Sequence, residues 1–150
     1  MKEYVFALLF LPTIGVQLAQ AQSTASSQKE SSFDRSQDEQ AIRQMITNGI
    51  SRDHYTEDII FASGAYPRPI VGLDNLKKAV PSGGERKNFK TNPIIERVEV
   101  AGSGDMAYAY GTSTISWEGK EPFEVAFLEV FRKKGDAWKL AARFIRPHQE

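Results

Sequence analysis

The most unusual chemical feature of this chain of 150 residues is one carboxyl group within an apolar strand pattern. Over residues 123–132, alternate side chains share one side of a strand, and this spacing groups Glu129 with Phe123 and Phe127. Burial of that side would raise the pKa of Glu129 and let it donate a hydrogen bond as a neutral acid. If the strand is reversed, Glu129 lies in solvent and the two aromatic rings can pack against a second copy.

Other reactive side chains show no comparable pattern. His54 and His148 are the only histidines and the chain has no cysteine, so no metal-ligand spacing occurs and no cofactor is indicated. Asp58 precedes a predicted strand, where a turn or capping role is expected. The 19 basic and 19 acidic residues balance, so nucleic acid is not an expected partner.

Residues 1–21 have the pattern of a signal peptide. One basic residue, Lys2, comes before an apolar run that ends at Ala19-Gln20-Ala21, a sequence typical of a cleavage site. The run is shorter than the roughly 20 residues that span a bilayer, so a retained membrane anchor is the weaker alternative. We therefore expect a secreted or periplasmic protein with no stable membrane insertion after signal cleavage.

Composition divides the rest of the chain into a linker and one domain. Residues 22–36 are rich in Ser and Gln, which predicts a flexible linker, and residues 37–148 suffice for one domain only. Apolar spacing predicts a first helix that begins near Ser36 and ends at Asn48-Gly49, and a second helix that follows Gly72. Strands are predicted over residues 59–61, 94–100, 106–117, 123–132 and 138–146.

Four short motifs in this order resemble the nuclear transport factor 2-like superfamily, in particular its SnoaL-like and ketosteroid-isomerase-like branch. They are Tyr55-Thr56-Glu57-Asp58 before a strand, Pro69-Ile70-Val71-Gly72 before a helix, Gly104-Asp105-Met106-Ala107-Tyr108, and Gly135-Asp136-Ala137-Trp138-Lys139-Leu140. The resemblance spans residues 37–146. It implies an α+β fold in which a cone-shaped, curved antiparallel sheet carries N-terminal helices on one face, a cystatin-like roll. Such proteins enclose a pocket and often form homodimers.

The resemblance also assigns expected positions to catalytic residues. Glu129 occupies the place where ketosteroid isomerases keep the protonated acid of their oxyanion hole. Ser63 aligns with their carboxylate base, and a hydroxyl cannot serve as that base unaided. Similar proteins have a longer helical region before Tyr55, so a more open pocket mouth is expected here. The resemblance therefore implies an isomerase-like pocket without a complete catalytic set.

Aromatic residues are abundant on the predicted strands and their turns. In a cone-shaped sheet, part of this set could line an apolar pocket with Glu129 at its polar end. The alternative is a collapsed core with no usable cavity, because protein interiors pack densely. The expected pocket residues are Tyr55, Phe61, Ser63, Tyr66, Tyr110, Trp117, Phe127 and Phe144.

Three functions are compatible with these patterns. The first is an exported domain that binds a small apolar molecule in the cone pocket without complete isomerase catalytic residues. The second is a diverged enzyme of the isomerase or cyclase type that uses Glu129 as an acid. The third is an association module, in which an apolar sheet face forms a homodimer.

Overall fold

The computed structural model describes residues 35–80 and 87–147, which belong to one compact unit, Asp34–Glu150. The predicted signal peptide, the linker up to residue 34 and His148 lie outside the described residues. The first helix includes residues 35 and 36, which the prediction assigned to the linker. In the part of the chain that is described, no helix is long and apolar enough to cross a membrane.

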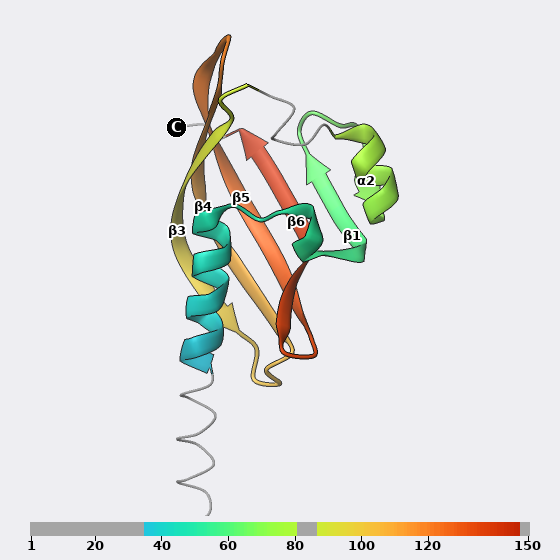
Figure 1. Ribbon diagram of the computed structural model, residues 1–150, viewed down its shortest axis with the longest axis vertical. Helices are drawn as coiled ribbons and strands as arrows, with labels where there is room; N and C mark the ends of the chain where they lie inside the picture. Colours follow the sequence, from blue (N-terminus) through green and yellow to red (C-terminus); the bar gives the residue numbers. More distant parts are fainter. Residues whose placement is uncertain (1–34, 81–86, 148–150) are drawn as a thin grey trace, which may run out of the picture. The chain divides into compact units, whose positions relative to one another are not determined.

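Six strands form one open sheet in the order β2-β1-β6-β5-β4-β3 (Figure 1). Neighbouring strands are antiparallel except β1 and β6, which run parallel, so the sheet is mixed. The predicted α+β class is therefore confirmed, with one parallel pair in a sheet that was expected to be antiparallel. The strands are β1 (Tyr55–Ser63), β2 (Ile70–Val71), β3 (Lys90–Val100), β4 (Met106–Trp117), β5 (Lys120–Lys134) and β6 (Ala137–Pro147).

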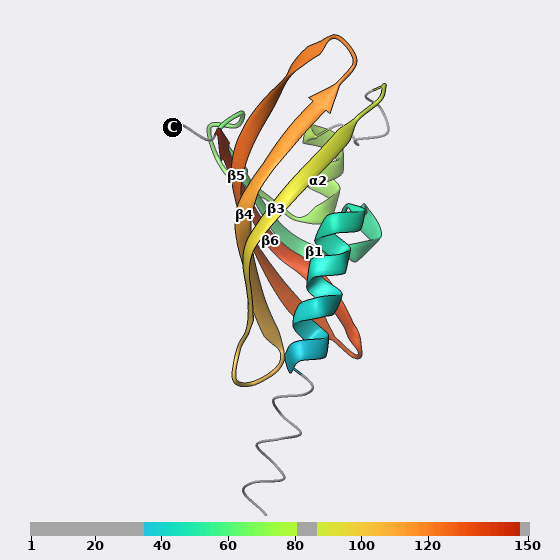
Figure 2. The ribbon, with the colours of Figure 1, turned by 90° about the vertical axis from the view of Figure 1, so that its left-hand side faces the viewer.

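The helices lie on one face of the sheet (Figure 2). They are the first helix over residues 35–48, the 3-10 helix η1 (Arg52–His54) and α2 (Leu73–Ala79). Ile42 and Leu76 from these helices are buried in one core with Phe131 and Leu140 from the sheet. The first helix ends as predicted because Gly49 adopts a φ of +85°, a conformation that side chains with a Cβ rarely take.

Two irregularities in the sheet set which side chains face the helices. Phe131 pairs with Leu140, whereas Val130 pairs with Ala142, so Ala141 is an extra residue in β6. A second extra residue interrupts the pairing of β3 with β4, opposite Gly111. A Cβ on Gly111 would lie 2.0 Å from the carbonyl oxygen of Ile94, so this close approach of two strands requires glycine.

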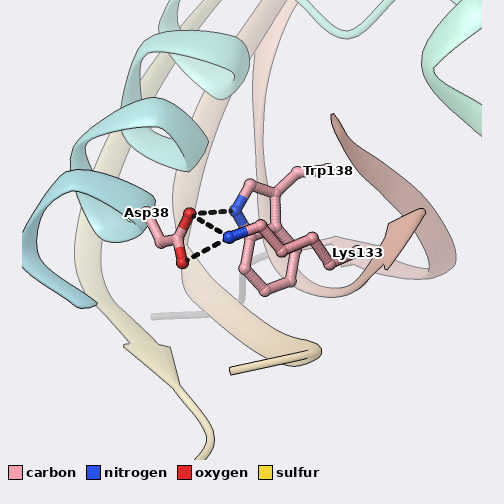
Figure 3. Close-up of polar contacts among 3 residues, drawn as sticks. All are labelled: Asp38, Lys133 and Trp138. Atoms are coloured by element: carbon pink, nitrogen blue, oxygen red, sulfur yellow. Dashed lines mark hydrogen bonds and ion pairs between the residues drawn. The ribbon is translucent and has the colours of Figure 1, made fainter. Parts of the chain in front are cut away.

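One polar cluster links the first helix to the hairpin between β5 and β6 (Figure 3). Lys133 Nζ lies 2.9 Å from both carboxylate oxygens of Asp38, and Trp138 Nε1 donates to Asp38 Oδ1 at 2.9 Å. The Lys133 ammonium also lies 5.5 Å from the centre of the Trp138 ring. Because Asp38 and Lys133 are largely shielded from solvent, this ion pair is better protected from screening than a surface pair. It anchors the helix that closes one side of the core.

Candidate functional site

A cavity of about 580 Å³ lies between the helices and the inner face of the sheet. Its size is within the range of roughly 300–1,000 Å³ that is typical of small-molecule sites. Every main element contributes to the lining, from the first helix through α2 to the strands β1, β3, β4, β5 and β6. Most of the wall is apolar and includes Ile46, Phe61, Val80, Ile115, Phe127 and Ile145. The described part of the domain therefore has a cavity where the alternative expectation had a collapsed core.

The polar end of the cavity is an ion pair between neighbouring strands. Glu129 on β5 and Arg143 on β6 are direct cross-strand partners. Glu129 Oε1 accepts a hydrogen bond from Arg143 Nε at 2.8 Å and lies 2.6 Å from Arg143 Nη2. The Glu129 side chain is 5% exposed and that of Arg143 is 19% exposed. The strand orientation that would leave Glu129 in solvent is therefore excluded.

Tyr55 completes this end of the cavity. Its hydroxyl oxygen accepts a hydrogen bond from Arg143 Nη1 at 3.1 Å, and the guanidinium carbon lies 5.8 Å from the centre of its ring. Since arginine can only donate, the hydrogen of the Tyr55 hydroxyl is not used in this contact. Glu129, Arg143 and Tyr55 therefore form one chain of polar contacts along the cavity wall.

Burial and charge act in opposite directions on the Glu129 carboxyl. Burial raises its pKa above the ordinary value, because the charged form is poorly solvated, and the positive charge and hydrogen bond of Arg143 offset part of this increase. The second oxygen, Oε2, is buried and has no hydrogen-bond partner among the described residues. The Glu129 carboxylate is thus held mainly by Arg143, and removal of Arg143 would leave a buried negative charge unpaired.

Arg143 was not predicted from the sequence. Simple alternation from Trp138 and Leu140 would have placed Phe144 on the inner face and Arg143 on the outer face. The extra residue Ala141 inverts this alternation, so that Arg143 faces the cavity and Phe144 does not. The sequence shows Arg143 in a strand with many apolar residues, but it does not show that Ala141 is an extra residue. This bulge turns Arg143 toward the cavity, and it arises from the pairing of β6 with β5.

The structure brings together only part of the predicted pocket. Tyr55, Phe61 and Phe127 line the cavity with Glu129. Ser63 lies at the end of β1 and lines a second, smaller hollow, together with Phe144. The expectation that these two residues line the main pocket is therefore wrong.

The other three predicted pocket residues also lie outside the lining. Tyr110 is on the opposite face of β4, because alternation in that strand places Ala109 and Gly111 inside. Tyr66 packs edge-on against Phe61 and donates a hydrogen bond to the carbonyl of Ala79 at 3.0 Å, which holds the loop after β1 against α2.

Trp117 is not among the residues that line the cavity, but it contacts two of them. Its ring contacts Phe89 and Phe123, which line the cavity, at centroid distances of 6.4 and 5.6 Å. The pairing of β4 with β5 shifts between Ile115 and Trp117, which turns the tryptophan out of the alternating pattern. Trp117 therefore extends the aromatic cluster of Phe89 and Phe123 beyond the lining.

The cavity has a single carboxyl group among its lining residues in the described ranges. Asp58 is exposed and forms a 2.6 Å ion pair with Arg132, which lowers the Asp58 pKa to about 2 through the hydrogen bond from that arginine. It lies within β1, so the expected turn or capping role is replaced by a surface ion pair. The cavity thus contains a donor-rich polar end but no second carboxylate that could act as a base.

The outer face of the sheet carries a row of exposed apolar side chains. Tyr110 pairs with Leu128, Leu128 with Phe144, and Phe144 with Ala62, so the row crosses four strands in register. The three large side chains are 37%, 40% and 41% exposed in that order. We call these four residues the outer apolar row. Such a contiguous patch is typical of an interaction surface.

Comparisons with known proteins place the fold. No protein-family model matches the chain, and no curated protein matches it in sequence. Among solved structures, a conserved protein from Planctomyces limnophilus matches with a TM-score of 0.56 and 21% identity, over 76% of this chain and 100% of that chain. A protein from Streptomyces avermitilis is provisionally described as a dehydratase of the nuclear transport factor 2-like family. It matches with a TM-score of 0.54 and 15% identity, over 74% of this chain and 92% of that chain.

A third structure, from Xanthomonas campestris, is provisionally described as a calcium/calmodulin-dependent protein kinase II association domain. It matches with a TM-score of 0.55 and 14% identity, over 66% of this chain and 72% of that chain. At these identities the likeness concerns the fold alone. The domain has the nuclear transport factor 2-like fold, so the predicted resemblance is confirmed at the level of the fold.

Proposed function

We propose that this domain binds a small, largely apolar molecule in the cavity between its helices and its sheet. The observation that carries the proposal is the cavity of about 580 Å³, whose wall is mostly apolar and has the ion pair of Glu129 and Arg143 at its polar end. Dense packing normally removes such spaces, so a wall built from every main element favours an occupied site. The predicted signal peptide adds the proposal that binding takes place after export.

Native mass spectrometry of the purified full chain tests the proposal directly. We expect an added small-molecule mass on the protein purified from a secretory host. A matched pair of variants then locates it, because Ser113 lines the cavity and its neighbour Thr114 points to the other face and is exposed. Ser113→Phe should fill the cavity and remove the added mass, whereas Thr114→Phe should retain it. Retention of the ligand by the Ser113 variant would contradict binding in this cavity.

A homodimer formed through the outer apolar row is a second candidate function. The carrying observation is that Tyr110, Leu128 and Phe144 are exposed side by side on an open sheet face. The description of the Xanthomonas structure as an association domain is in accord with it. Sedimentation of the wild type should then show a dimer at micromolar concentration, and Leu128→Lys should give a folded monomer. Thr114→Lys is the control, because Thr114 lies on the same face outside the row. A monomeric wild type would exclude this function.

A diverged isomerase- or cyclase-like activity is a third candidate, favoured by the burial of Glu129 and its raised pKa. The Streptomyces structure is described as a dehydratase, which makes a lyase-type test reasonable. The ion pair with Arg143 favours the carboxylate, so Glu129 would have to gain a proton to act as an acid. Turnover of an enolisable ketone that is lost in Glu129→Gln would support this candidate. Turnover that is unchanged in this variant would exclude an acid role for Glu129.

A further inference from the structure

We propose that the cavity binds amphipathic monocarboxylates, with the apolar body against its aromatic wall and the carboxylate on Arg52. The inference rests on the proposed function and names the ligand class of the same cavity. It is carried by one observation. Arg52 lines the cavity, and its guanidinium has no carboxylate partner among residues 35–80 and 87–147.

The charged groups in the described lining do not balance. They are the cations Arg52 and Arg143 and a single carboxyl group, that of Glu129. Arg143 occupies this carboxyl group, since its Nε and Nη2 lie 2.8 and 2.6 Å from Glu129 Oε1. One positive charge therefore remains, and it belongs to Arg52. A proton on Glu129 would only add to this excess, so an anion is the complementary ligand.

Among the described residues, the Arg52 side chain has one polar contact, which holds it without neutralising it. Nη2 donates a hydrogen bond to the carbonyl of Val80, the residue that follows α2 and also lines the cavity. The carbonyl has no net charge, and a guanidinium has five N–H donors, so four remain. A carboxylate can accept two of them side by side. Because Arg52 is already tethered, less side-chain freedom is lost on binding.

Burial favours Arg52 over Arg143 as the anion site. Arg52 is half-buried, so a carboxylate paired with it can keep part of its hydration. An anion at Arg143 would lie against the Glu129 carboxylate, whose side chain is 5% exposed, and buried like charges repel strongly. The apolar body of the ligand would cover the aromatic part of the lining, which includes Phe61, Phe89, Phe123 and Phe127.

A matched charge series tests the ligand class. Naphthoate, naphthylmethanol and naphthylmethylammonium share one ring system and carry an anion, a neutral hydroxyl or a cation. Isothermal titration of the full chain at neutral pH should show naphthoate binding about tenfold more tightly than the alcohol, since charge-assisted hydrogen bonds are the stronger ones. Naphthylmethylammonium should bind more weakly than either. Added salt should weaken the binding of naphthoate and leave that of the alcohol unchanged.

Arg52→Gln is the decisive variant, because it removes the charge and keeps a side-chain donor for the Val80 carbonyl. Naphthoate should lose its advantage over the alcohol in this variant and keep most of it in Arg52→Lys. Arg43→Gln is the matched control and should leave all three affinities unchanged. Arg43 is also half-buried and also donates to a backbone carbonyl, that of Ile95, but it does not line the cavity.

Nuclear magnetic resonance of the wild type decides the matter if Arg52→Gln does not fold. The arginine Nε–H signal that is missing from Arg52→Lys identifies Arg52. It should shift with naphthoate and not with naphthylmethanol. A signal that shifts with neither probe would contradict the assignment.

Ser113→Phe separates this inference from the proposed function, because it fills the cavity and should abolish the binding of every probe. Equal affinities of the three probes, or a preference for another probe, would overturn the inference; if that binding is lost in Ser113→Phe, the proposed function stands. A preference for naphthoate that survives in Arg52→Gln would overturn the assignment to Arg52. Binding of no probe, or binding that Ser113→Phe retains, would overturn both.

Discussion

Removal of Arg143 is expected to be the most costly single polar substitution in this domain. In Arg143→Met the long apolar stem is kept, but Glu129 loses its contacts at 2.8 and 2.6 Å, and Tyr55 loses its donor at 3.1 Å. Water can replace these contacts only poorly, because the Glu129 side chain is 5% exposed. Breaking a buried pair by removal of one partner costs about 3–5 kcal/mol. At about 4 °C per kcal/mol for a domain of this size, the midpoint of thermal unfolding should fall by about 12–20 °C.

The assay is urea unfolding followed by tryptophan fluorescence, for the single variants and for the double variant Glu129→Met/Arg143→Met. The double variant should recover most of the loss, since it leaves no unpaired charge in the core. Arg132→Met is the matched control, because its ion pair with Asp58 is exposed to solvent, which screens it, and should contribute little to stability. If Arg143→Met costs no more than Arg132→Met, the account of the polar end is refuted.

The same variant predicts a pH dependence with a defined sign. Without Arg143, burial raises the pKa of Glu129 further above its unfolded value of about 4.3. A group with a raised pKa in the folded state contributes its stability below the unfolded pKa and loses it as the pH rises through the folded pKa. The deficit of Arg143→Met relative to the wild type should therefore be smallest near pH 4 and grow toward pH 8. A deficit that is constant over this range would contradict the assignment.

Three further predictions concern other parts of the domain. Asp38→Ala removes the acceptor that a lysine and a tryptophan share, and should cost about 1–3 kcal/mol in urea unfolding, with loss of the near-ultraviolet tryptophan signal. The hydrogen bond from Arg132 lowers the pKa of Asp58 to about 2, so the stability that the charged Asp58 contributes is present above pH 4 and is lost as the pH falls through 2. The difference in stability between Asp58→Asn and the wild type should therefore vanish as the pH falls through 2. Gly111→Ala should cost about 2 kcal/mol or more because its Cβ meets a backbone carbonyl, whereas Gly102→Ala, which meets nothing within 4 Å, should be neutral in the same assay.

Local patterns in the sequence were sufficient for the order and type of the elements. The helix that ends at Gly49 and the strands after residue 90 follow from spacing that neighbouring residues share, whereas the inward orientation of Glu129 was one of two alternatives that the spacing left open. These features depend on backbone preferences, on the helical period of 3.6 residues and on the strand period of 2 residues. All of these can be recognised in short segments of the sequence. The parallel pairing of β1 with β6 joins segments about 80 residues apart, so no local pattern indicates it.

The site itself was only half predictable. Glu129 was found because a carboxyl in an apolar alternation is visible in the sequence. Arg143 was missed because Ala141 reverses the alternation of β6 through its pairing with β5. The same shift moved Phe144 to the outer face.

The sequence by itself determined where the two main helices and the long strands lie and which strand carries an acid among apolar residues, since these depend on neighbours a few positions apart. Tertiary structure alone decided which cation faces that acid, how much space remains between sheet and helices, and which aromatic rings line it. These properties depend on strand register and on the distance between packed layers, and both are set by contacts between segments far apart in the chain.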